Sequence, residues 1–256
     1  MAKNSLRPSP SVLAVLATVL LTAGWLMASF PLLIFLGLAP LMAVAESKDK
    51  NDSILEKMEL VLLILAIAFM ARAFLHHSSV VMALVSAIGF TIAFVAHTWV
   101  RQTLGIHAGK ITLIIFWLAV EYVFLKVISS NGLYLADTLS LQGSWTRWNP
   151  HTGYLGSSLW ILLVNACWYM AFLQGSGIRL GWMVVGILLM AGPLSYGYTL
   201  AGPPITREIM INLYENLPAD LDVTYLARGE WVVRTAAWLS TLILIFTFVK
   251  HQTKKK

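Results

Sequence analysis

Three charged side chains lie within long apolar stretches of this sequence: Arg72, Glu121 and Lys126. A charge in mid-membrane costs roughly 3 kcal/mol, so such residues face other helices, pair with one another or extend to the interface. Lys126 is near the end of its stretch, off the three- or four-residue helical spacing from Glu121, and is expected to extend outward. Glu121 is near the middle, with Arg72 as a candidate partner. Two interpretations stay open: the carboxylate only bonds a neighbouring helix, or it acts directly in function.

The other residue types that do chemistry are isolated. The single cysteine, Cys167, lies in an apolar stretch with no histidine or lysine near it, so we expect it to pack rather than react. The histidines show no metal-ligand spacing beyond one adjacent pair. Asn165 is expected to hydrogen-bond between helices. The sequence predicts no catalytic residue, no metal site and no cofactor.

The elements that position these residues are predicted by the composition. The 256 residues are 58% hydrophobic and 12% charged, with mean hydropathy +0.75, which is more apolar surface than a soluble core of this size buries. The apolar residues form runs long enough to cross about 30 Å of hydrocarbon. We predict an all-α, polytopic integral membrane bundle of about eight transmembrane helices in a single domain. The predicted spans are 11–27, 30–45, 60–75, 78–97, 111–131, 155–173, 180–200 and 232–249.

Three polar segments interrupt these runs. The stretch 46–59 is rich in charges of both signs and is expected to be a solvated loop. The stretch 132–154 contains Trp145 and Trp148, which suits an interfacial segment with an aromatic belt. A short third segment, 201–231, precedes the last span.

The distribution of Lys and Arg predicts the orientation. With the N-terminus inside, the inner segments hold twelve of these residues and the outer segments four: Arg147, Arg207, Arg228 and Arg234. The bias predicts an N-in, C-in topology, with 132–154 and 201–231 on the outer face. Because the net charge of +6 lies largely in loops and at the C-terminal lysines, membrane phospholipids are the expected partner rather than nucleic acid.

Four stretches, in order, resemble the apolipoprotein N-acyltransferases, the third in the form that this family has in Bacteroidetes. Residues 28–44 (ASFPLLIFLGLAPLMAV) resemble that family's first helical hairpin, and residues 116–125 (FWLAVEYVFL) its Trp-x-x-x-Glu helix, which aligns Trp117 and Glu121. Residues 145–169 (WTRWNPHTGYLGSSLWILLVNACWY) are the most specific match. Residues 224–240 (TYLARGEWVVRTAAWLS) resemble the passage into its last helix.

The resemblance implies a location in the bacterial inner membrane and a role in lipoprotein biosynthesis. Members of the family transfer an acyl chain from a phospholipid to a lipoprotein through a Glu, Lys and Cys triad. That triad lies in a nitrilase-like domain inserted before the last helix. Here the interval is only 201–231, which is too short for such a domain and contains no cysteine. The resemblance therefore covers the transmembrane part only.

Three hypotheses follow. The first is a non-catalytic relative that binds lipid or a lipoprotein, or serves as a subunit of a membrane complex. The second is the membrane half of a split acyltransferase, with a nitrilase-like protein acting in trans. The third is a small transporter that uses Glu121 and Arg72. The residues expected to bind a lipid or a partner are Arg72, Trp117, Glu121, Trp145, Trp148 and Asn165.

Overall fold

The computed structural model consists of helices joined by short connections. It describes residues 8–27, 31–47, 54–75, 79–128, 132–175, 177–204, 206–208 and 223–254, without the side chains of Leu75, 106–110 and 223–230. Within this part every regular element is a helix, as predicted. In chain order they are α1 (Pro10–Leu26), η1 (Pro31–Leu33), α2 (Ile34–Ala45), α3 (Ile54–Leu75), α4 (Val80–Leu104), α5 (Ile106–Ile128), η3 (Leu135–Leu139), η4 (Gly143–Thr146), α6 (Asn149–Thr152), α7 (Gly156–Trp168), the π-helical η5 (Tyr169–Leu173), α8 (Leu180–Thr199) and α10 (Val223–Lys254).

Each predicted span falls on a helix, although residues 30, 78 and 129–131 of those spans lie outside the described part. Five helices in the described part are long and apolar enough to cross a membrane. They are α4, α5, α7 with η5, α8 and α10. The α1 and α2 helices are apolar but shorter. The chain is thus a helical protein whose helices suit a membrane.

Several helices extend beyond the predicted spans: α4 continues to Leu104, α5 begins at Ile106, and α3 and α10 also begin early. The α3 helix begins at Ile54, so Glu56, Lys57 and Glu59 belong to its first turns rather than to a solvated loop. An acidic residue in a first turn is favourable because the helix dipole is positive there. The α10 helix begins at Val223, nine residues before the predicted span. The apolar stretch stops where charged residues begin, whereas the backbone hydrogen bonding of the helix continues into the charged residues.

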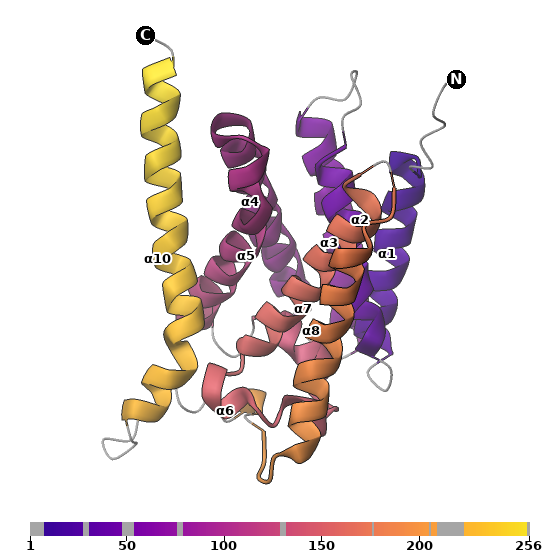
Figure 1. The fold of residues 1–256 in the computed structure, drawn as a ribbon, viewed down its shortest axis with the longest axis vertical. Helices are drawn as coiled ribbons and strands as arrows, with labels where there is room; N and C mark the ends of the chain where they lie inside the picture. The colour runs from indigo at the N-terminus through magenta and orange to yellow at the C-terminus, as the bar shows by residue number, and fades with distance from the viewer. Residues whose placement is uncertain are drawn as a thin grey trace.

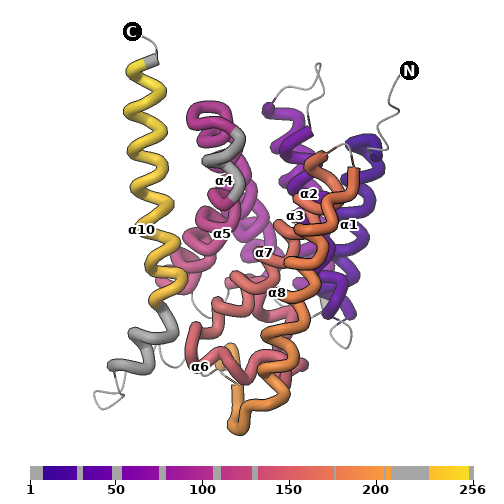
Figure 2. Tube along the Cα trace, viewed as in Figure 1, coloured from indigo at the N-terminus to yellow at the C-terminus, as the bar shows by residue number. Residues whose placement is uncertain are grey.

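The helices form an arc in which each packs on the next: α8, α7, α2, α1, α3, α4, α5 and α10. The α7 helix also contacts α5 across the inside of the arc. Figure 1 shows that α1 begins and α10 ends at the same end of the bundle, and the short helix α6 lies at the opposite end. The path in Figure 2 alternates between these two ends, as expected for sequential antiparallel helices.

Aromatic side chains fill the middle of the arc. The ring of Phe90 stacks on Trp117 with centroids 4.1 Å apart, and Phe69 lies 5.6 Å from Phe90 on the other side. Phe94 meets Trp117 edge to face. All four side chains are at most 2% exposed. Close aromatic packing therefore joins α3, α4 and α5.

Asn165 joins α7 to α2 through hydrogen bonds to the backbone of α2. Pro40 lies inside α2, and a proline there lacks an N–H and crowds the preceding turn. The Asn165 side-chain oxygen accepts hydrogen bonds from the backbone N–H groups of Leu38 and Ala39 at 2.9 and 3.0 Å. Its side-chain nitrogen donates to the Ile34 carbonyl at 2.9 Å. The prediction that Asn165 bonds between helices is confirmed, and its partner is the proline-interrupted helix.

Replacing Asn165 with leucine is expected to destabilise the bundle by about 2 kcal/mol, because buried backbone groups of α2 lose their partners. The measurement is unfolding of the purified protein in detergent, followed by circular dichroism. Thr199→Val is the control, since that exposed hydroxyl bonds only within its own helix. Equal stability of the two variants would show that the amide does not support α2.

Candidate functional site

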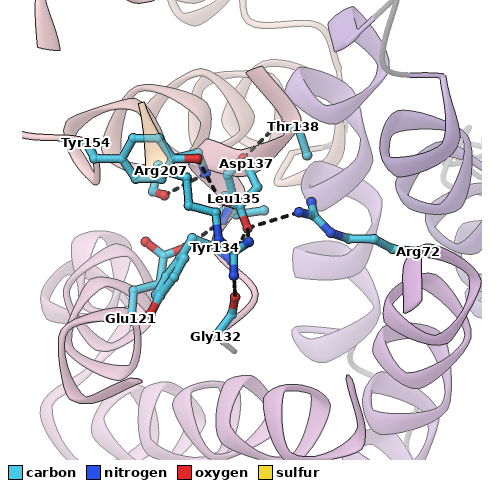
Figure 3. A network of polar contacts seen from close by, with 11 residues as sticks. Arg72, Glu121, Gly132, Tyr134, Leu135, Asp137, Thr138, Tyr154 and Arg207 are labelled. Carbon is cyan, nitrogen blue, oxygen red and sulfur yellow. Dashed lines mark hydrogen bonds and ion pairs between the residues drawn. The ribbon is translucent and has the colours of Figure 1, made fainter. Parts of the chain in front are cut away.

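A buried carboxylate, Asp137, collects polar contacts at the end of the bundle where α3 and α5 finish (Figure 3). It lies in η3, and its Oδ2 accepts from the backbone N–H of Tyr134 at 3.1 Å, which caps that short helix. Its Oδ1 accepts from the Tyr154 hydroxyl at 2.6 Å. Only 2% of the side chain is exposed, so solvent contributes little to its charge.

Two arginines from distant parts of the chain neutralise this carboxylate. Arg72, in the last turn of α3, donates to Asp137 Oδ2 at 3.1 Å and lies 4.3 Å above the ring of Trp25. Arg207 donates to the same oxygen at 2.7 Å, and its other nitrogen donates to the Gly132 carbonyl at 2.7 Å. In Figure 3 the two guanidinium groups reach the carboxylate from different elements. We call Arg72, Tyr134, Asp137, Tyr154 and Arg207 the Asp137 network.

Glu121 lies beside this network on α5 and is fully buried. Its Oε1 accepts from Trp117 Nε1 at 3.3 Å and from the backbone N–H of Leu135 at 2.9 Å. Its Oε2 has no hydrogen-bond partner among the described residues. The carboxylate thereby fixes the start of η3, two residues before Asp137. A helix residue and the following interfacial segment are joined through this one side chain.

The two tyrosines of the network are held in their neutral form. Burial raises the pKa of Tyr154 well above its usual value, and the charge of Asp137 and the hydrogen bond to it raise it further. Burial and the same carboxylate also raise the pKa of Tyr134. Both phenols are therefore proton donors, and the Tyr154 hydroxyl always has an acceptor in Asp137.

The predicted interfacial tryptophans attach the segment 132–154 to two helices, Trp145 to α8 and Trp148 to α7. Trp145 Nε1 donates to the Tyr198 hydroxyl at 3.1 Å. Gly197 is required there, because an added Cβ would lie 2.5 Å from the Ser144 carbonyl oxygen. Trp148 is buried, donates to the Trp145 carbonyl at 2.7 Å and packs edge to face on Trp160. Both tryptophans position this segment rather than lying on a free surface.

The structure corrects the expected pairing of the intramembrane charges. Arg72 was the candidate partner of Glu121, but in the described part of the chain its carboxylate partner is Asp137. Trp117 and Glu121 do bond to each other, and they lie next to the network. Asn165 does not belong to it, since its partners are on α2 and α7.

The sequence did not predict that Asp137, Tyr154 and Arg207 belong to a site. One signal was present: Asp137 is the single acidic residue in 132–154. Arg207 belongs to the segment 201–231, of which residues 205 and 209–222 lie outside the described part. The sequence around Arg207 does not indicate that Asp137 is its partner, because the two residues are 70 positions apart.

The arrangement suits fixed positioning better than proton transfer. Asp137 accepts four hydrogen bonds, three on Oδ2 and one on Oδ1, so most of its acceptor capacity is used for structural contacts. Glu121 has a spare oxygen but no exposed surface. Cys167 is 3% exposed and lies against Gly186 of α8.

Asp137→Asn is expected to lower the free energy of unfolding by about 3 kcal/mol, because two arginines keep their charge and lose their ionic partner. Chemical unfolding in detergent measures this loss. Glu208→Gln, in the same segment and outside these contacts, is the control. Adding Arg207→Gln to Asp137→Asn should cost less than the sum of the single changes. Strict additivity would show that the ion pair is not formed.

The tyrosines predict a loss of stability in alkali. Their folded-state pKa values lie above the ordinary value of 10.0, so their stabilisation is complete below that pH and is lost as pH rises past it. Tyrosinate absorbance should contain a late component that appears only as the protein unfolds. Tyr154→Phe should reduce this component, whereas Tyr198→Phe, which removes an exposed phenol, should not. An unchanged late component in Tyr154→Phe would contradict the assignment.

Comparison of the chain with models of protein families, with curated proteins and with solved structures finds no match to any of them. The resemblance to the apolipoprotein N-acyltransferases therefore rests on the four sequence stretches alone.

Proposed function

We propose that the chain is a non-catalytic scaffold of the bacterial inner membrane that binds lipid or a lipoprotein, or joins a larger membrane complex. This proposal rests on one observation: the carboxylates of Asp137 and Glu121 are hydrogen-bonded and enclosed by the protein. Asp137 accepts four hydrogen bonds, two of them from arginines, and Glu121 is fully buried. A site built in this way holds segments in place and does not turn over a substrate.

For the topology we propose eight spans, with both ends on the cytoplasmic side. Figure 1 supports an even number of crossings, since α1 begins and α10 ends at the same end of the bundle. The Lys and Arg bias gives that end to the cytoplasm, because twelve of these residues fall in its segments and four in the opposite ones. In this topology the Asp137 network faces the periplasm.

The periplasmic end offers a preformed platform. Arg207 comes from the segment in which the acyltransferases carry their catalytic domain, and here it is bonded to Asp137 and Gly132. Its side chain is 26% exposed, so a partner can contact it without opening the bundle. The α8 helix adds an apolar face for lipid, since only 11% of its span is buried within the chain.

The split acyltransferase is the second candidate. The anchored Arg207 favours it, because a nitrilase-like protein in trans would dock where that segment meets the bundle. The small transporter is the third candidate and has less support. The Asp137 network is separated from the opposite end by the rings of Phe69, Phe90 and Trp117, which are at most 2% exposed.

The test is mild-detergent purification of the tagged protein from its native host, with mass spectrometry of bound proteins and lipids. A lipoprotein or a nitrilase-like protein is expected to be recovered. Its yield should fall about fivefold in Arg207→Gln, because the platform loses a charge-assisted contact. Arg179→Gln is the matched control, since Arg179 lies just before the first residue of α8 and bonds Gln174.

Each outcome separates the hypotheses. Recovery of a nitrilase-like protein, with acyl transfer by the reconstituted pair, would establish the split enzyme in place of the scaffold. Recovery of bulk membrane lipid alone, unchanged by Arg207→Gln, would contradict both and would leave transport assays as the next step.

A further inference from the structure

A second polar cluster lies at the opposite end of the bundle, around Glu46 at the end of α2. Its Oε1 lies 3.2 Å from His97 Nε2, and its Oε2 bonds the Tyr169 hydroxyl and the Arg101 guanidinium. His97 Nδ1 in turn lies 2.8 Å from Thr112 Oγ1. Burial alone would raise the pKa of Glu46, but these hydrogen bonds and the charge of Arg101 lower it overall. The carboxylate is ionised, and both of its oxygens have partners.

A pocket of about 300 Å³ opens beside this cluster, between the end of α2, the start of α3 and the end of α4. This volume is at the lower limit of ordinary small-ligand sites. Six polar residues line it: Glu46, Ser47, Lys57, Thr98, Arg101 and Gln102.

Hydrogen-bond donors outnumber free acceptors in this pocket. Lys57 Nζ has three donor positions, and the structure uses one of them for the Ser47 carbonyl at 2.5 Å. Thr98 Oγ1 is buried and has no hydrogen-bond partner among the described residues. Glu46 is the one acidic side chain among the described lining residues, and it is bonded to His97, Tyr169 and Arg101. A ligand that complements the pocket therefore carries negative charge and several acceptor oxygens.

We infer that this pocket binds a phosphate group, with Lys57 and Arg101 facing its charge and Thr98 donating to one oxygen. A phosphate offers acceptor oxygens to several donors at once, which matches this lining. Two sources share this chemistry: a phospholipid headgroup and soluble phosphate. The apolar rim favours the lipid, because Ile54 lines the pocket and Leu55 beside it is 74% exposed. The inference is independent of the proposed function, which concerns the other end of the bundle.

The test uses the full-length protein in detergent, with native mass spectrometry after addition of phosphatidylglycerol or of diacylglycerol with the same acyl chains. Phosphatidylglycerol should be retained and diacylglycerol should not. Retention should fall about fivefold in Lys57→Gln and about threefold in Thr98→Val, because each change removes one donor to the phosphate. Lys57→Arg should restore it. Lys126→Gln removes the same charge at the opposite end and should leave retention unchanged.

A second arm adds millimolar inorganic phosphate and follows thermal unfolding. Stabilisation of the wild type but not of Lys57→Gln, without lipid retention, would assign the pocket to soluble phosphate and still support the inference. Two results would overturn it: equal retention of phosphatidylglycerol by the wild type, Lys57→Gln and Thr98→Val, or equal retention of diacylglycerol. A melting temperature for each variant in the absence of ligand confirms that all of them fold.

Discussion

The carboxylate of Asp137, removed from water and bonded by two arginines, is the constraint on which one whole end of this molecule depends. A buried charge is tolerated only when hydrogen-bond donors surround it, and here they come from the end of α3, from η3, from the approach to α7 and from Arg207. These four parts of the chain therefore have one arrangement in which all the charges are paired. The network acts as a joint between helices and interfacial segment, with Glu121 as a second attachment point.

The need of buried polar atoms for hydrogen-bond partners also explains the other polar contacts of the bundle. Pro40 leaves α2 short of regular hydrogen bonding, and the Asn165 amide from α7 supplies partners to both N–H and C=O groups. At the far end, Glu46 is held by groups from α4 and η5. Lipid provides no hydrogen bonds, so each polar atom within the bundle selects a particular neighbour. Apolar packing alone would allow the helices to slide and rotate.

The sequence predicted the helices well and the site in part, for physical reasons that differ. An apolar run is a local property, so each predicted stretch falls on a helix, and five helices of the described part are long and apolar enough to cross a membrane. The boundaries of α3 and α10 were missed because hydropathy does not register charged helical turns. Glu121 and Arg72 were found because an intramembrane charge is conspicuous. Their partners were not, because the pairing of Arg72 with Asp137 depends on how distant helices approach.

The aromatic core separates the two polar ends of the bundle. Trp117 bonds Glu121 on one side and stacks on Phe90 on the other, so the Asp137 network ends against a wall of rings. Beyond that wall, His97 on α4 and Thr112 on α5 begin the cluster around Glu46. No polar chain joins the two ends within the described residues. Since α4 and α5 each run from one end to the other, a change at one end reaches the other only through movement of these tightly packed helices. The two ends are thus separate polar clusters, linked in the described part of the chain by the packed helices between them.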